Sequence, residues 1–225
     1  MRITRLDIFL LISALLSILT ALLCSADVLM EGKLPRLPAY NDIVSSLAAG
    51  YFTSVIVYFL VVRIPEERRR RRIRRMLLSR YQELKSDLIG LLIHASGKAY
   101  SDEPESFQDP KKFREYFEFD ETGSGGRWYE VLNGLNDYYI GEINNHLQIF
   151  SGELHFALGQ IDVQRDDVFD YLKRFSTSIS SMKTRKTDYD DIKIWGRYLW
   201  SILGSSDFVS GRSDTDRIEE LINRI

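Results

Sequence analysis

The sequence predicts an all-α membrane protein in which a two-helix transmembrane hairpin is followed by a cytoplasmic helical bundle of about four helices. Two stretches carry no charge: the 19 residues between Asp7 and Asp27 and the 20 residues between Asp42 and Arg63. An arginine-rich run follows the second stretch directly. In the rest of the chain, apolar residues recur in steps of three and four, which is typical of amphipathic helices.

The first apolar stretch, residues 8–26, allows two interpretations. The residues before it resemble the basic start of a signal peptide, and Cys24, Ser25 and Ala26 would serve as a cleavage site. The apolar run is longer than a signal peptide needs, and Asp7 adjoins it directly. We therefore predict a retained span, with a cleaved signal over residues 1–26 as the alternative.

The second apolar stretch, residues 43–62, predicts a transmembrane helix. It has no charged residue and no Pro, and it is rich in Val, Ile, Phe and Leu. Twenty helical residues extend roughly 30 Å, which matches the hydrocarbon thickness of a bilayer. A helix of this length in a soluble core would ordinarily carry a polar face.

Basic residues predict the orientation of the hairpin. The connection over residues 27–42 contains only Lys33 and Arg36 as basic residues, whereas arginines precede the first span and crowd behind the second. By the positive-inside rule, both termini are predicted to be cytoplasmic and residues 27–42 to form an outer loop. The predicted domains are the hairpin over residues 1–64, a juxtamembrane helix over 65–97 and a cytoplasmic domain over 98–225.

Small residues recur at every fourth position in both spans and so lie on one face of each helix. Small side chains let two helix backbones approach closely, either within one hairpin or between hairpins of different copies. This pattern predicts transmembrane packing and a homo-oligomer. The predicted packing residues are Ser13, Ser17, Ala21, Ser46, Gly50 and Ser54.

A new helix is expected from Pro65, because proline suits the first turn of a helix. The arginines that follow are too dense to pack in a core. We expect them to contact anionic lipid headgroups, at about 1 kcal/mol per basic residue near the surface. The predicted headgroup contacts are Arg63, Arg68, Arg69, Arg70, Arg71, Arg72, Arg74 and Arg75.

Charge is unevenly distributed along a chain whose formal net charge is only −2. Residues 1–75 hold 12 Lys and Arg against 6 Asp and Glu, so residues 76–225 are acidic. Nucleic acid binding needs clustered positive charge, so we expect no nucleic acid partner. The single Cys24 cannot form an internal disulfide.

The cytoplasmic part is predicted to be helical throughout. Apolar residues from Ile73 to Ala95 follow steps of four and three, the spacing of a coiled-coil or bundle seam. A short helix should follow the Asp109–Pro110 cap, and a flexible TGSGG joint lies at 122–126. Further helices are expected over 128–158, 168–182, 192–202 and 213–225, the last capped by Ser213 or Asp214.

No residue set in the sequence predicts catalysis, a cofactor or a metal site. Glu142 and His146 share a helix face, but a metal-binding bundle needs a second such pair. The aspartates near 166 and 188 stand at predicted helix starts, where carboxylates favour the helix dipole. Phosphate-binding, serine-hydrolase and zinc-protease motifs are absent from the sequence. Trp128, Trp195 and Trp200 are predicted to be core residues, with ligand stacking as the alternative.

The layout of hairpin, arginine-rich junction and cytoplasmic helical domain looks like that of bacterial two-transmembrane effectors of defence and stress systems. This resemblance rests on layout alone and implies no residue roles, but it favours a bacterial inner membrane. The leading hypothesis is a non-enzymatic protein whose helical domain senses or binds a cytoplasmic protein partner and whose hairpin anchors it or disturbs the membrane. The alternatives are a passive membrane anchor or scaffold, and an enzyme with an unrecognised site on the helical domain.

Overall fold

The computed structural model describes residues 5–25, 38–97, 104–118, 126–161, 163, 165–183, 188–207 and 211–225. It divides the chain into two compact units, Met1–Arg69 and Arg70–Ile225. The described residues are almost entirely helical, which confirms the all-α prediction. Two predicted connections, residues 27–37 of the outer loop and 122–125 of the glycine-rich joint, lie outside the described residues.

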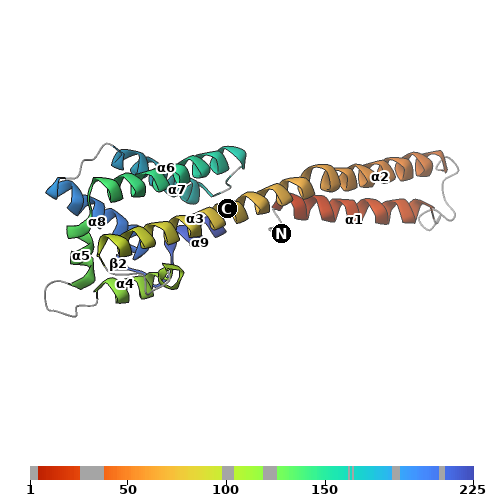
Figure 1. Cartoon of the computed structure of the whole chain (residues 1–225). Helices are drawn as coiled ribbons and strands as arrows, with labels where there is room; N and C mark the ends of the chain where they lie inside the picture. The colour runs from red at the N-terminus through yellow and green to blue at the C-terminus, as the bar shows by residue number, and fades with distance from the viewer. Residues whose placement is uncertain are drawn as a thin grey trace. The chain divides into compact units, whose positions relative to one another are not determined.

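The first unit consists of two apolar helices that lie side by side (Figure 1), α1 (Arg5–Ser25) and α2 (Pro38–Tyr58). A π-helical turn, η1 (Phe59–Arg63), continues α2 into α3 (Ile64–Ala95). The stretch that begins at Ile43 is long and apolar enough to cross a membrane, whereas the apolar part of α1, Asp7–Leu22, is shorter. Among the described residues, one helix therefore has the length and composition of a membrane span.

The second unit is built around the remainder of α3. The predicted seam is confirmed, because Leu77, Tyr81 and Leu88 are completely buried. The helices that surround this seam are α4 (Pro110–Glu118), α5 (Gly126–Gly134), α6 (Asp137–Gln160), α7 (Asp166–Met182), α8 (Tyr189–Leu203) and α9 (Arg217–Asn223), with a short 3-10 turn η2 (Pro104–Phe107) before α4. Helices α6 and α7 pack along each other (Figure 1).

Helix α4 begins where the sequence predicts, since the Asp109 carboxylate accepts hydrogen bonds from the amides of Lys111 and Lys112 at 2.9 and 3.1 Å. The single helix predicted over 128–158 is wrong, because two helices occupy that range. A side chain at Gly134 would collide with the carbonyl oxygen of Ala95, so α5 ends where it approaches α3 closely. Asn136 then caps α6 by accepting from the amide of Tyr139 at 3.1 Å.

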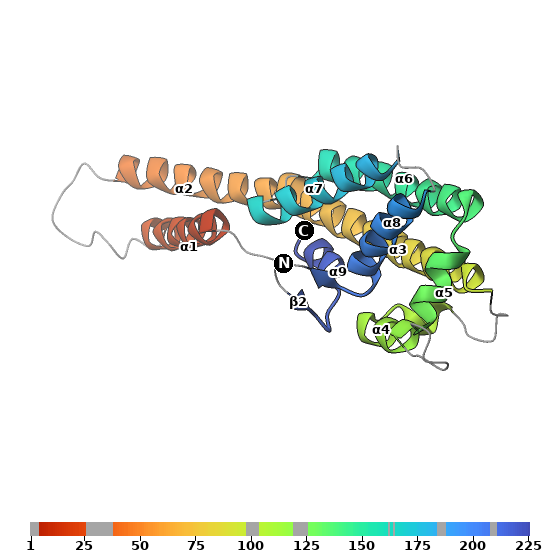
Figure 2. The same cartoon turned by 90° about the vertical axis from the view of Figure 1, so that its left-hand side faces the viewer.

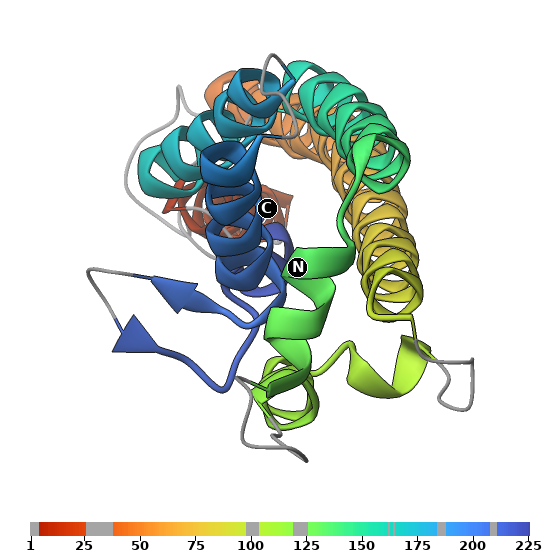
Figure 3. The ribbon, with the colours of Figure 1, turned by 60° about the vertical axis from the view of Figure 1, so that its left-hand side comes forward.

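The C-terminal segment differs from the predicted helix over 213–225. Two short antiparallel strands, β1 (Ser206–Asp207) and β2 (Gly211–Arg212), precede the last helix, and β1 lies beside α8 (Figure 3). Gly211 has a φ of 76°, a value that favours glycine. Helix α9 starts at Arg217, and its cap is Asp216 rather than Ser213 or Asp214.

An aromatic cluster joins α4, α5 and α8, and Figure 2 shows α4 and α5 next to each other. The Trp128 and Trp200 ring centroids are 4.8 Å apart, and the Phe113 centroid lies 5.4 Å from that of Trp200. Trp195 is completely buried. Trp195 is therefore a core residue, and Trp128 and Trp200 are partly buried and pack against the core. Their ring contacts contribute about 0.5–1.5 kcal/mol per pair beyond burial.

Candidate functional site

A groove of about 1030 Å³ opens in the second unit between α7, α8 and the C-terminal segment. Its lining includes an apolar floor in which Ile202, Ile218 and Leu221 are buried. Tyr171 and Tyr198 extend the floor toward α7 and α8. We call this feature the α7–α9 groove. Its volume is at the upper end of the range for small-molecule sites and also suits a short peptide segment.

Five exposed arginines line the α7–α9 groove, namely Arg174, Arg197, Arg212, Arg217 and Arg224. Among the described residues, only three carboxylates line it: Asp167, Asp216 and Glu220. Acidic residues outnumber basic ones across residues 76–225, so the groove reverses the charge of the domain that contains it. A local excess of arginine over an apolar floor is suited to an anionic partner.

Several of these arginines are held in place. Arg212 pairs with Glu118 at 2.8 Å, Arg224 lies 3.6 Å from Glu220, and the Arg217 guanidinium lies 4.9 Å from the centre of the Tyr171 ring. Among the described residues, Arg197 has no ion pair. Exposed pairs of this kind contribute about 0–1 kcal/mol, so a ligand carboxylate could replace them at little cost.

Tyr198 ties the α7 and α8 walls of the groove together. Its hydroxyl lies 3.1 Å from that of Ser178 on α7. Burial raises the pKa of Tyr198 above its ordinary value of 10.0, and the Ser178 hydrogen bond lowers it by less. The side chain is therefore a neutral hydroxyl near neutral pH.

The third wall, the C-terminal segment, is fixed by a buried carboxylate. Asp216 accepts from Lys85 Nζ at 2.7 Å and from the Tyr81 hydroxyl at 3.0 Å, and it also caps α9. Burial, followed by the charge of Asp216, raises the pKa of Tyr81 well above 10.0. Nothing in the sequence marks this network, because Lys85 adjoins the apolar seam of α3 and would ordinarily be expected in solvent.

A second buried cation, Arg114 of α4, holds the segment between α8 and α9. Its guanidinium donates to the carbonyl oxygens of Gly204 at 2.6 Å and Ser213 at 2.8 Å, and to the Asp214 carboxylate at 2.6 Å. Charge-assisted hydrogen bonds are about twice as strong as neutral ones. The groove wall is therefore positioned by two buried basic residues that sequence analysis did not single out.

The predicted headgroup residues occupy different environments. Arg68, Arg69, Arg71, Arg72 and Arg75 are exposed on α3, and Arg70 and Arg74 are partly exposed. Arg74 donates to the carbonyl oxygen of Asn223 at 3.2 Å. Arg63 is buried and pairs with Asp7 at 2.8 Å.

The predicted small-residue faces of the two apolar helices also differ. On α1, Ser13, Ser17 and Ala21 are partly buried, and Ser13 Oγ lies 2.6 Å from the Tyr51 hydroxyl of α2. On α2, the face that packs on α1 includes Ala48, Phe52 and Val55. The predicted residues of α2, Ser46, Gly50 and Ser54, are instead exposed.

The histidines and acidic clusters have structural partners. His146 Nδ1 lies 3.0 Å from an Asp87 oxygen, and His155 Nδ1 lies 3.0 Å from Ser176 Oγ, but Ser176 is completely buried and unreachable for a substrate. Asp188 caps α8, as predicted for a helix start. Within the described ranges, no group of three His, Cys, Asp or Glu side chains could hold a metal ion.

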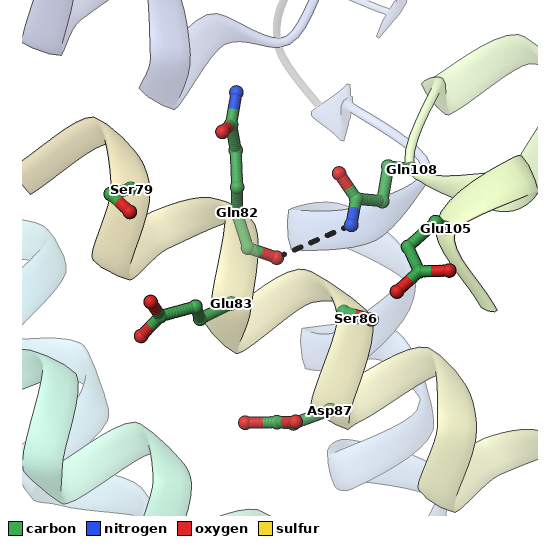
Figure 4. A pocket seen from close by; sticks show the side chains of 7 residues that line it. All are labelled: Ser79, Gln82, Glu83, Ser86, Asp87, Glu105 and Gln108. Carbon is green, nitrogen blue, oxygen red and sulfur yellow. Dashed lines mark hydrogen bonds between the residues drawn. The ribbon is translucent and has the colours of Figure 1, made fainter.

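A polar hollow of about 510 Å³ lies along α3, facing Glu105 and Gln108 (Figure 4). Gln108 donates to the carbonyl oxygen of Gln82 across it at 3.4 Å. Two of its carboxylates already have partners, since Glu83 pairs with Arg80 at 2.7 Å and Asp87 lies against His146. The described residues that line the hollow include no apolar side chain and no cation, so it is a weaker candidate than the α7–α9 groove.

No family model matches the chain, and neither a curated protein nor a solved structure shows significant similarity to it.

Proposed function

We propose that this chain is a non-enzymatic membrane protein whose helical domain binds an acidic segment of a cytoplasmic protein partner in the α7–α9 groove. The observation that carries the proposal is the reversal of charge at the groove, where five arginines border an apolar floor within an acidic unit. Apolar contacts would supply affinity, and the arginines would select carboxylates and orient the bound segment.

The membrane part of the proposal is supported by the outward-facing side chains of the first unit. Phe9, Leu15, Leu47 and Val61 are each about two-thirds exposed, at 66–70%. So much apolar surface is unfavourable in water and favourable in lipid. We propose that α1 and α2 both span the bilayer of a bacterial inner membrane, with both termini in the cytoplasm.

The orientation is tested with a reporter and a tag on the full chain. A reporter that works only in the cytoplasm, fused after Ile225, should be active. A tag inserted near Lys33 should be reached by reagents from outside the cell. A mature protein that begins at Asp27 would instead establish a cleaved signal and a single span.

Two further contacts belong to the proposed function. The exposed arginines of α3 would bind anionic lipid headgroups near the membrane surface. The exposed face of Ser46, Gly50 and Ser54 would bring hairpins of different copies together, because all three residues are exposed in a single chain and a Cβ atom at Gly50 would meet no atom within 4 Å. If the protein is an effector, clustered hairpins would be the species that disturbs the membrane.

The groove is tested by site-specific photo-cross-linking on the full chain in its native host. A photoreactive residue at Ser201, which lines the groove, should yield a protein adduct whose cross-linked peptide is rich in Asp and Glu. The photoreactive residue placed instead at position 173 should not yield that adduct, because Lys173 is exposed on α7 outside the groove lining. The double variant Arg197→Glu/Arg217→Glu should reduce the yield at least tenfold, which corresponds to about 1.4 kcal/mol.

Three outcomes contradict the proposal: an equal adduct at Lys173, a cross-linked peptide without acidic residues, or an adduct insensitive to the double variant. Absence of any adduct at Ser201 would favour the passive anchor. A soluble substrate converted by the purified chain would favour the enzyme alternative.

A further inference from the structure

One face of α6 is exposed although it is largely apolar. Tyr138, Ile149 and Phe156 are 66%, 58% and 55% exposed, respectively. Gly141, Gly152 and Gly159 lie between and beyond them and are also exposed. We call these six residues the α6 face. It carries no charge, and charge depletion is characteristic of the centre of protein interfaces.

Packing within the chain does not explain the three glycines. A Cβ atom added at Gly141, Gly152 or Gly159 would meet no atom within 4 Å. A side chain at Gly134 or Gly196, in contrast, would collide with Ala95 or Leu132. Each exposed glycine costs the helix about 1 kcal/mol relative to alanine, so the open face destabilises α6 without a compensating contact inside the chain.

The large side chains and the glycines form two rows. Each large residue is followed three positions later by a glycine: Tyr138 by Gly141, Ile149 by Gly152, and Phe156 by Gly159. At 100° per residue, the glycine row lies about 60° around the helix from the large row. The α6 face is thus a ridge beside a row of gaps, which is open from Gly152 to Gly159 and is interrupted by the exposed Asn145 between Gly141 and Gly152.

We propose that the α6 face binds the α6 face of a second copy of this chain, with the two helices parallel. A two-fold axis along the helix direction brings opposite edges of identical faces together, so each ridge enters the partner's row of gaps. Phe156 then lies between the levels of Gly152 and Gly159 of the partner subunit, as a knob in a hole. In an antiparallel pair, ridge would meet ridge and gaps would meet gaps.

The contact involves one helix from each copy, so its area is small compared with the roughly 1,600 Å² of a standard interface. Anchoring in a common membrane, part of the function proposed above, raises the effective concentration of the second copy and lets a small interface pair. The surface itself is identified independently of that anchoring, from the exposure and spacing of α6 residues.

Disulfide cross-linking of the full chain in membranes tests the contact. Asn145 is exposed on α6 between the two halves of the face, so cysteines at this position lie at the same level in a parallel pair. In a Cys24→Ser background, Asn145→Cys should form disulfide-linked dimers on mild oxidation. Thr177→Cys, exposed on α7, is the matched control and should remain monomeric. Cross-linking at 145 no greater than at 177 overturns the proposal.

A variant that fills the gap at Gly152 distinguishes loss of the α6–α6 contact from misfolding of the chain. Gly152→Leu closes this gap but favours the helix, so the thermal midpoint should stay equal or rise while cross-linking at 145 falls at least tenfold. Tyr129→Glu, which charges an exposed aromatic residue of α5, should leave cross-linking unchanged. Unchanged cross-linking in Gly152→Leu overturns the proposal. Cross-linking lost in Gly50→Leu but kept in Gly152→Leu assigns the contact to the hairpin and also overturns it.

Discussion

Arg63 Nη2 and Asp7 Oδ2 form an ion pair of 2.8 Å between side chains that are only 10% and 1% exposed. The pair joins the end of η1 to the start of α1, 56 residues earlier in the chain. Removing residues 1–26 as a signal peptide would take away Asp7 and leave the Arg63 guanidinium without this carboxylate. The pair is thus present only in a chain that retains residues 1–26.

The first prediction concerns this pair. Asp7→Asn removes the carboxylate of this buried ion pair and should destabilise the first unit by about 3–5 kcal/mol. Thermal aggregation of the protein in detergent, compared with wild type, measures the effect. The double variant Asp7→Asn/Arg63→Gln removes both charges and should recover most of the loss. Equal stability of wild type and Asp7→Asn would show that the pair contributes nothing.

The second prediction concerns the small-residue face of α2. Gly50→Leu fills a position with no neighbour within 4 Å, so the hairpin of a single chain should tolerate it. Membrane levels should be normal, whereas oligomers cross-linked through Cys24 and toxicity on overexpression should decrease. A fall in membrane abundance would mean that this face packs within the hairpin after all.

The third prediction concerns the arginines of α3. Replacing Arg68–Arg72 by Gln in a peptide of residues 63–100 should weaken binding to vesicles with anionic lipid by about fivefold per arginine, from about 1 kcal/mol each. Replacement by Lys keeps the charge and should retain most of the binding. Vesicle binding of the wild-type peptide should also weaken with added salt, because exposed charges farther apart than the Debye length, about 8 Å at physiological ionic strength, are largely screened. Vesicle binding that changes with neither salt concentration nor lipid charge would rule out headgroup binding by these arginines.

The fourth prediction concerns the buried network of Lys85 and Asp216. Lys85→Met leaves the carboxylate buried without its cation and should cost about 3–5 kcal/mol, with α9 released first. Hydrogen exchange in residues 213–225 should rise accordingly. Arg224→Gln breaks only an exposed pair on the same helix and should change stability by less than about 1 kcal/mol. Equal exchange in the two variants would contradict the structural role of Lys85.

The fifth prediction concerns alkaline pH. Tyr81 and Tyr198 have folded-state pKa values above 10.0, the value expected when the chain is unfolded. Their contribution to the free energy of unfolding is complete below pH 10 and is lost as the pH rises from 10 toward the folded-state pKa. The free energy of unfolding should fall by up to about 1.4 kcal/mol for each tyrosine and each pH unit in that range. Tyr198→Phe should flatten the decline between pH 9 and 11 in urea unfolding. A decline equally steep in the variant would exclude Tyr198 as its source.

Local patterns were sufficient for the elements that depend on a few neighbouring residues. The apolar spacing from Ile73 to Ala95 predicts the buried face of α3, because every third or fourth side chain of a helix points the same way. Asp109 was predictable as a cap, since a cap needs only the amides two or three residues ahead. Asp188 was predicted only to stand near a helix start, and it caps α8. The all-α class follows from the same periodicity.

Tertiary structure decided what depends on partners far along the chain. The break between α5 and α6 reflects the approach of Gly134 to Ala95, and the start of α9 at Arg217 reflects the binding of Asp216 by Lys85 and Tyr81. The sequence by itself determined the helical class, the apolar and basic segments and the Asp109 cap of α4, because these follow from residues within one or two turns. Only the folded chain brought arginines from α7, α8 and the C-terminal segment to one groove and left the α6 face uncovered, because burial and pairing there depend on long-range packing.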